Sequence, residues 1–133
     1  IEPLARGETD FVNTVAEAMA LVEDIGSPGL QTMIDCSAAG QAEAEPVAAL
    51  MERWMPGGHI AHVQVNDPNR RGPGQGAMAF APILHTIARM QAAGHYRGVV
   101  AVEPFDYVPD GMGSAARAIG YLRGLVEGLA IGR

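Results

Sequence analysis

The chain has 133 residues, 48% of them hydrophobic, a length and composition that suit a single folded domain rather than a disordered segment. Nine arginines, no lysine and fifteen acidic residues give a net charge of −6, which argues against nucleic acid as a partner. The single cysteine, Cys36, has no partner for an internal disulfide and no apolar run is long enough to span a membrane, so we expect a cytoplasmic protein without membrane contact.

Helical and extended patterns alternate along the chain. The first three residues, IEP, are interpreted as the end of a strand. Residues 10–25 place apolar side chains at three- and four-residue spacing, which predicts an amphipathic helix that Thr9 or Asp10 caps and Gly26 ends. The later predicted elements are a strand at 30–35, a helix at 46–55, a strand at 60–65, a helix at 80–94, a strand at 98–104 and a helix at 114–129.

Strands separated by helices in this way predict βαβ units and a parallel sheet. Four such units amount to half of an eight-stranded barrel, which typically needs about 250 residues. The pattern therefore leaves two α/β architectures open, a doubly wound open sheet and half a barrel. In either case we expect residues 1–133 to form a single domain.

A polar residue lies at or near the end of each predicted strand. These residues are Glu2, Asp35, Gln64 and Glu103. Parallel α/β folds place their sites at the carboxyl ends of the strands, so the four side chains should converge. A single acid in such a place is commonly a helix cap, and Gln64 could equally be a structural amide. Four such residues, one at or near the end of each predicted strand, favour a shared site. Because all four offer oxygen atoms, the site suits Mg²⁺ or Mn²⁺ better than zinc.

The stretch HVQVNDPNRRGPGQG at 62–76 supplies further candidates. Arg70 lies six residues beyond Gln64, so its guanidinium could hold an oxyanion or a substrate hydroxyl in the cavity. His62 alternates with Gln64 on one strand face and could line the cavity, or could be an ordinary core histidine. The three glycines match no nucleotide-binding loop and are interpreted as turn residues. Arg71 is interpreted as a solvated loop residue or a partner for surface acids.

Several segments together resemble the C-terminal half of the sugar phosphate isomerase/epimerase family. They are IEPL, ETDFVNT, MID, HVQVNDPNRRGPGQG, FAPIL and VAVEPFDY, in this order. This is a xylose isomerase-like (β/α)₈ TIM-barrel group that includes the ketose 3-epimerases and hydroxypyruvate isomerase. The resemblance implies a half-barrel of four βα units, completed by a missing N-terminal half or by dimerisation, because a lone half-barrel leaves sheet edges and an apolar face uncovered.

The resemblance also implies roles for the site residues. In the family, two Glu, an Asp and a His or Gln bind a divalent metal, and the glutamates serve as acid and base. The matching ligands are Glu2, Asp35, Gln64 and Glu103, with Glu2 and Glu103 as the catalytic pair. Arg70 matches an arginine that contacts substrate oxygens. Ala38 and Ala77 depart from the pattern, since the epimerases commonly have His at the first position and a polar residue at the second.

The implied function is a metal-dependent isomerase or epimerase of a small ketose, sugar phosphate or related hydroxy-carbonyl compound. It would act through an enediolate, with Mn²⁺ or Mg²⁺ as cofactor, a sugar-like small molecule as substrate and a homodimer as the assembly. Two alternatives stay open. One is a dehydratase or lyase of the same superfamily, and the other is a degenerate half-barrel that binds a ligand without turnover.

Overall fold

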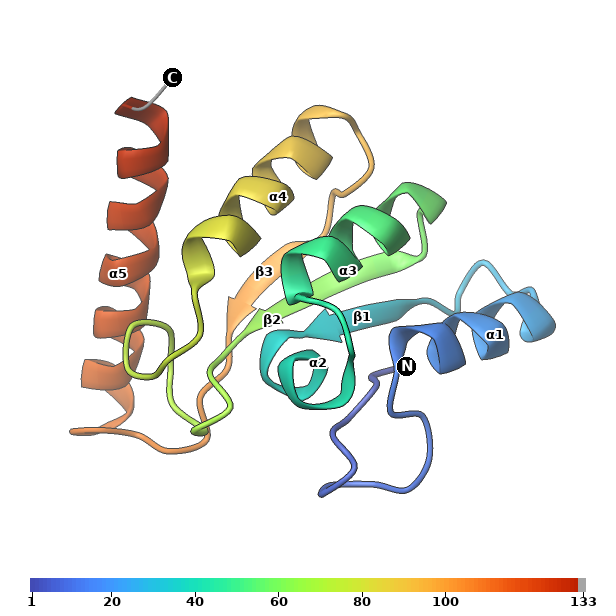
Figure 1. The fold of residues 1–133 in the computed structure, drawn as a ribbon, viewed down its shortest axis with the longest axis horizontal. Coiled ribbons are helices and arrows are strands. Elements are labelled where there is room, and N and C mark those ends of the chain that lie inside the picture. The colour runs from blue at the N-terminus through green and yellow to red at the C-terminus, as the bar shows by residue number, and fades with distance from the viewer. Residues whose placement is uncertain (132–133) are drawn as a thin grey trace.

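A three-stranded parallel sheet forms the centre of the computed structural model, which describes residues 1–131 (Figure 1). The strands are β1 (Thr32–Asp35), β2 (Ile60–Val65) and β3 (Val99–Val102), in the order β1-β2-β3. The helices are α1 (Val15–Ile25), α2 (Cys36–Ala42), α3 (Val47–Trp54), α4 (Phe80–Ala92) and α5 (Gly111–Ile131), with a 3₁₀ turn, η1 (Met55–Gly57), after α3. The parallel α/β architecture expected from the sequence is confirmed.

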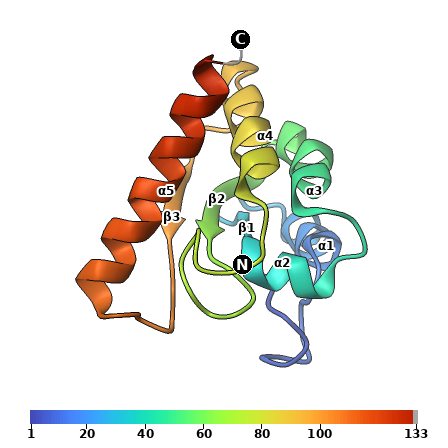
Figure 2. The same ribbon diagram turned by 60° about the vertical axis from the view of Figure 1, so that its left-hand side comes forward.

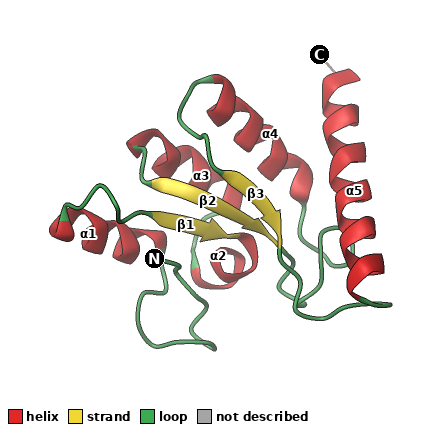
Figure 3. Ribbon diagram, turned by 180° about the vertical axis from the view of Figure 1, so that it is seen from behind, coloured by secondary structure: helices red, strands yellow, loops and turns green. Residues whose placement is uncertain are grey.

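The helices α3, α4 and α5 lie side by side along one face of the sheet (Figure 2). Seen from behind, the strands face the viewer and α3 and α4 lie beyond them (Figure 3). The core between these layers contains Ile34, Val63 and Val65 from the strands. Because successive strand residues point to opposite faces, His62 and Gln64 lie on the face that these helices leave open.

The first helix begins later than predicted. Thr14 and Glu17 form a capping box, in which the Thr14 side chain accepts from the Glu17 backbone N–H and the Glu17 side chain accepts from the Thr14 backbone N–H. This pairing satisfies the free amides at the start of α1, so the helix starts at Val15. The prediction of Thr9 or Asp10 as the cap is therefore wrong, whereas Gly26 ends the helix in a left-handed conformation as expected.

The first predicted strand is also wrong for the part of the chain that the structure describes, because residues 1–3 are not a strand. They nevertheless lie against β1, since the Ile1 amino group donates to the Gln31 carbonyl at 2.7 Å and the Thr32 hydroxyl donates to the Ile1 carbonyl at 3.0 Å. Residues 1–131 thus contain three strands instead of four. Glu2 still reaches the end of the sheet where β1 terminates.

The remaining predicted elements are confirmed with shifted ends. The strand at 60–65 is found as predicted, whereas β1 and β3 are shorter than their apolar runs and α5 begins three residues earlier. Helix α2 was not predicted because its sequence, CSAAGQA, has no amphipathic pattern. No helix among residues 1–131 combines the length and apolar character needed to cross a membrane.

Candidate metal centre

Three carboxylates meet at the C-terminal end of the sheet. Glu2, Asp35 and Glu103 each offer an oxygen within 4.8 Å of the other two. They come from the segment before α1, the last residue of β1 and the residue after β3, and the parallel register brings the strand ends level. The structure therefore brings together three of the four predicted strand-end residues.

Asp35 is the buried member of this group, with 5% of its surface exposed. One carboxylate oxygen, Oδ1, accepts from the Ala38 backbone N–H at 2.6 Å and so caps α2. The other, Oδ2, accepts from the Asn66 side-chain amide at 2.7 Å. Burial raises the pKa of Asp35, and these hydrogen bonds partly offset the rise by stabilising the charged form.

The two glutamates also have raised pKa values. For Glu2, loss of hydration is the main cause of the raised pKa, followed by the negative charges of Asp35 and Glu103. For Glu103, loss of hydration again raises the pKa most, followed by the charge of Asp35. Like charges at this spacing disfavour full ionisation, so a bound cation would relieve the repulsion.

Gln64 lies on β2 between the acids. It pairs in register with Asp35 on one side and with Ala101, two residues before Glu103, on the other. Its side-chain oxygen, Oε1, is buried and has no hydrogen-bond partner among the described residues. A buried carbonyl oxygen without a partner is uncommon. Like the three carboxylates, this atom is an oxygen donor, and an all-oxygen set is what a hard divalent cation prefers.

Arg70 lies on the wall of a cavity of about 220 Å³ beside the acids. The cavity is lined by Glu2, Asp35, Arg70 and Phe105, among others. Arg70 has a left-handed backbone (φ 70°), and its carbonyl accepts from the backbone N–H groups of Phe105 at 2.9 Å and Asp106 at 2.8 Å. The guanidinium carbon lies 5.1 Å from the centre of the Phe105 ring. The predicted substrate contact is therefore placed at the cavity.

His62 takes a different position from Arg70. It lines a neighbouring hollow on the open face of the sheet, together with Glu2 and Met33, and it does not line the cavity that contains Arg70. A positive charge on His62 would lower the pKa of Glu2, which counts among the smaller influences on that carboxylate. The histidine thus lies next to one acid of the cluster.

Two residues that line the cavity, Glu8 and Asn66, were not among the site residues predicted from the sequence. Glu8 lines the cavity from the loop before α1, and its charge raises the pKa of both Glu2 and Glu103. No strand-end pattern marks a residue in that loop. Asn66 directly follows β2, so its position at a strand end is the sequence signal that also marks Asp35.

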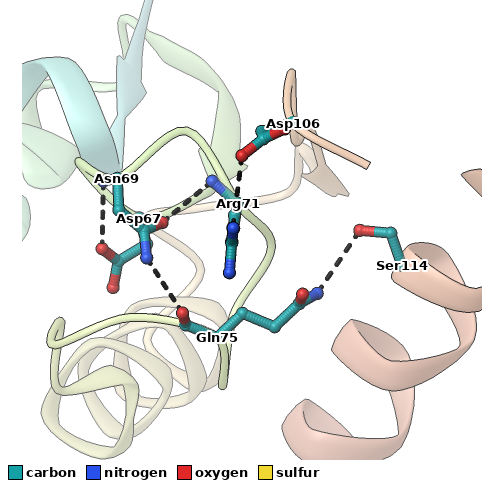
Figure 4. A network of polar contacts seen from close by, with 6 residues as sticks. All are labelled: Asp67, Asn69, Arg71, Gln75, Asp106 and Ser114. Carbon is teal, nitrogen blue, oxygen red and sulfur yellow. Dashed lines mark hydrogen bonds and ion pairs between the residues drawn. The ribbon is translucent and has the colours of Figure 1, made fainter. Parts of the chain in front are cut away.

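A network of polar contacts ties the loop after β2 to Asp106 and Ser114 (Figure 4). The Asp67 carboxylate accepts from the backbone N–H of Met78 at 2.8 Å, and Gln75 donates to the Ser114 hydroxyl at 3.3 Å. Arg71 pairs with Asp106 at 3.2 Å, as expected for a partner of surface acids. A Cβ at Gly76 would overlap the Asp67 carboxylate, so this glycine is needed for a close approach.

Comparison with known families decides between the two architectures left open by the sequence. The family model for the xylose isomerase-like TIM barrel matches residues 1–125. The chain belongs to the xylose isomerase-like TIM barrel family. Its three parallel strands are therefore part of a TIM barrel and not of a doubly wound open sheet. The resemblance to this family noted in the sequence is confirmed.

Epimerases of this family are among the proteins most similar to the chain. D-psicose 3-epimerase of Agrobacterium fabrum is 32% identical over 105 residues, which cover 79% of this chain and 34% of that protein. A crystal structure of D-psicose 3-epimerase in the presence of D-fructose superposes with a TM-score of 0.68 at 30% identity, over 80% of this chain and 35% of the other. The chain thus spans about a third of the length of these TIM-barrel relatives.

A third match supports the fold alone. The apo form of 3-keto-D-glucoside 4-epimerase from E. coli superposes with a TM-score of 0.73 over 95% of this chain and 44% of the other, at 23% identity. The match includes nearly all of the sheet and helices described above.

Proposed function

We propose that the chain supplies the metal ligands and the acid–base pair for epimerisation of a small ketose. The observation that carries the proposal is the meeting of Glu2, Asp35 and Glu103 within 4.8 Å of one another, with the unpartnered Oε1 of Gln64 on the strand that pairs with β1 at Asp35. The similarity to ketose 3-epimerases supports the reaction class, and the cavity next to the acids supports a small substrate.

The proposed ligands of a divalent cation, Mn²⁺ or Mg²⁺, are Glu2, Asp35, Gln64 and Glu103. All four offer oxygen, which these cations prefer. When bound, the cation supplies positive charge that stabilises the negative charge developing on the substrate's carbonyl and hydroxyl oxygens. Asp35 is the member best fixed in orientation, because both of its oxygens already accept hydrogen bonds from the chain.

Glu2 and Glu103 are the proposed acid and base. One carboxylate removes the proton from the carbon beside the carbonyl, and the electron pair of that C–H bond moves toward the carbonyl oxygen to form an enediolate. The other carboxylic acid returns a proton to the opposite face of the same carbon, which inverts it. Raised pKa values suit both roles, since a carboxyl group that holds a proton closer to neutrality is a better acid–base catalyst there.

Arg70 and His62 are the proposed substrate contacts. Arg70 lines the cavity, and its guanidinium can donate to a substrate oxygen that gains negative charge. Its backbone is held by Phe105 and Asp106, so the side chain starts from a fixed point. His62 lies beside Glu2 on the open sheet face and could contact the end of a substrate that extends past that acid.

The metal part of the proposal is tested by thermal unfolding with increasing Mn²⁺. We expect Mn²⁺ to raise the melting temperature of the wild type, because a ligand that binds only the folded state stabilises it. Glu103→Gln should lose most of this shift, whereas Glu23→Gln on the exposed side of α1 should keep it. An absence of any Mn²⁺-dependent shift in the wild type would contradict the metal site.

The catalytic part is tested by NMR in D₂O with D-fructose and with D-psicose in the presence of Mn²⁺. A 3-epimerase should introduce deuterium at carbon 3 and interconvert the two sugars. Loss of water from the sugar would instead favour the lyase alternative. Mn²⁺ binding without exchange on either sugar would favour a module that binds without turnover, an alternative to which the apolar residues Ala38 and Ala77 lend weight.

We further propose that the barrel is completed by a second half, either another copy of this chain or an N-terminal half. The open sheet face supports this, since Val99 on the edge strand β3 is 66% exposed. Exposed apolar strand residues on an unpaired edge favour association. Sedimentation of the chain at micromolar concentration should show a dimer if two copies suffice, and a compact monomer would contradict the dimer.

A further inference from the structure

Asn66 joins the ends of the two strands that carry Asp35 and Gln64. It is 1% exposed and directly follows β2, while Asp35 is the last residue of β1. Its side-chain Nδ2 donates to Oδ2 of Asp35 at 2.7 Å, and its Oδ1 accepts from the backbone N–H of Ser37 at 2.9 Å. One buried side chain thus bridges the end of β2 to the carboxylate and to the first turn of α2.

The orientation of the Asn66 amide follows from its partners. The Ser37 backbone N–H is a donor, so it requires the oxygen of the amide, and the nitrogen is left to face Asp35. The ionised Asp35 carboxylate can only accept hydrogen bonds, so a donor is required there as well. Both contacts agree on a single orientation, and reversing the amide would set donor against donor and acceptor against acceptor.

These hydrogen bonds orient the Asp35 carboxylate but leave lone pairs on its oxygens for a cation. A carboxylate offers about four lone-pair positions on its two oxygens. The Ala38 backbone N–H takes one on Oδ1 and Asn66 takes one on Oδ2. One Asp35 oxygen also lies within 4.8 Å of an oxygen of Glu2 and of an oxygen of Glu103. Asp35 is therefore held in one orientation while still able to bind a cation.

We propose that Asn66 is the positioning residue for Asp35 in the metal centre. It holds the carboxylate by a buried hydrogen bond so that a divalent cation meets a preformed ligand. This inference rests on the metal site proposed above. Substituting a residue that hydrogen-bonds to a metal ligand typically weakens metal binding by about 10- to 100-fold.

The test compares Mn²⁺ dissociation constants by calorimetry for the wild type, Asn66→Ala and Asn66→Leu. Leucine has the same branching as asparagine but no hydrogen-bonding atoms, so it separates the lost donor from the space left by alanine. We expect both variants to bind Mn²⁺ about 10- to 100-fold more weakly than the wild type. Circular dichroism and urea unfolding without metal establish that each variant is folded.

Thr86→Val is the matched control. Thr86 is 3% exposed and its hydroxyl donates to the exposed Glu52 carboxylate at 3.3 Å in the helical layer, so this variant also loses a hydrogen bond from a buried side chain to a carboxylate. We expect it to lower the free energy of unfolding without changing the Mn²⁺ dissociation constant. An equal loss of Mn²⁺ affinity in this control would show that general destabilisation is responsible and would overturn the role of Asn66.

The outcomes separate the two proposals. If the wild type binds Mn²⁺ and both Asn66 variants bind it equally tightly, the positioning role is wrong and the metal site stands. If the wild type binds no Mn²⁺, the metal site itself is wrong and the role of Asn66 fails with it. Weaker binding in both Asn66 variants, with unchanged binding in Thr86→Val, supports the positioning role.

Discussion

The two faces of the sheet differ in burial and in the side chains they carry. On the helix-covered face, Ile34, Val63 and Val65 are almost fully buried and belong to the hydrophobic core. On the open face, neighbouring positions of the same strands carry His62 and Gln64, and the acids gather at its C-terminal end. The covered face stabilises the fold by burial, whereas the open face concentrates groups that repel one another or lack partners.

Successive residues of each strand point to opposite faces, so a side chain that stabilises the core is followed by one that faces the proposed metal site. Substitutions on the covered face should change the free energy of unfolding and leave metal binding intact. Substitutions at Glu2 and Glu103 should change metal binding and leave the metal-free protein no less stable, whereas Asp35 also caps α2 and so contributes to stability.

The largest effect is expected at Ile34. Ile34→Ala should lower the free energy of unfolding by about 2–5 kcal/mol, because it removes buried apolar surface and leaves a cavity. Met33, its neighbour on the open face, is the matched control, and Met33→Ala should lower the free energy by less than about 1 kcal/mol. Urea unfolding measures both. Equal losses would show that the open face contributes as much to stability as the covered one.

The loop after β2 should be the next most sensitive region. Gly76→Ala would push a Cβ into the Asp67 carboxylate and weaken its hydrogen bond to Met78, so we expect a loss of about 1–3 kcal/mol in urea unfolding. Gly120→Ala is the control, because Gly120 lies in α5 with open space around it and alanine should stabilise that helix by up to about 1 kcal/mol. A neutral Gly76→Ala would contradict the close approach.

The sequence predicted the fold well where periodicity is strong. The strand at 60–65 and the apolar helices are set by patterns that tertiary contacts reinforce, and so they are found as expected. The start of α1 was placed too early because Phe11 fits the helical spacing, yet Thr14 and Glu17 offer the better cap. Local hydrogen bonds thus outweighed the position of one apolar side chain.

The site was predictable only in part for a related physical reason. Residues at strand ends share one edge of a parallel sheet, so the sequence alone predicts that Glu2, Asp35, Gln64 and Glu103 form a group. Glu8 reaches the cavity through the path of a loop, and no periodic signal describes such a path. The bridge made by Asn66 depends on the backbone of α2, a helix without an amphipathic pattern.

A smaller effect is expected from pH in the metal-free protein. The folded-state pKa values of Glu2, Asp35 and Glu103 are raised, chiefly by burial. Their stabilising contribution is therefore fully present below the ordinary values, 4.5 for the glutamates and 3.8 for Asp35, and is lost as the pH rises through the raised pKa values. The free energy of unfolding attributable to these groups should fall toward neutral pH.

Glu103→Gln should make that fall shallower, because it removes one of the three charges. Relative to the wild type in a chelator, the variant should gain stability between pH 4 and pH 7, by less than about 1 kcal/mol since Glu103 is partly exposed. Chemical unfolding at several pH values measures the difference, and Glu23→Gln controls for the loss of an exposed acid. A variant that loses stability toward pH 7 would contradict the repulsion.

The smallest effect is expected at the ion pair between Arg71 and Asp106. The two side chains are 40% and 53% exposed, so water screens their attraction, and Asp106→Asn should lower the free energy of unfolding by less than about 0.5 kcal/mol. The variant keeps the Asp106 backbone N–H that donates to the Arg70 carbonyl at 2.8 Å, so the KM for the proposed ketose substrate should not change. If the KM rises several-fold while the protein stays equally stable, the side-chain pair, and not the backbone contact, holds Arg70 at the cavity.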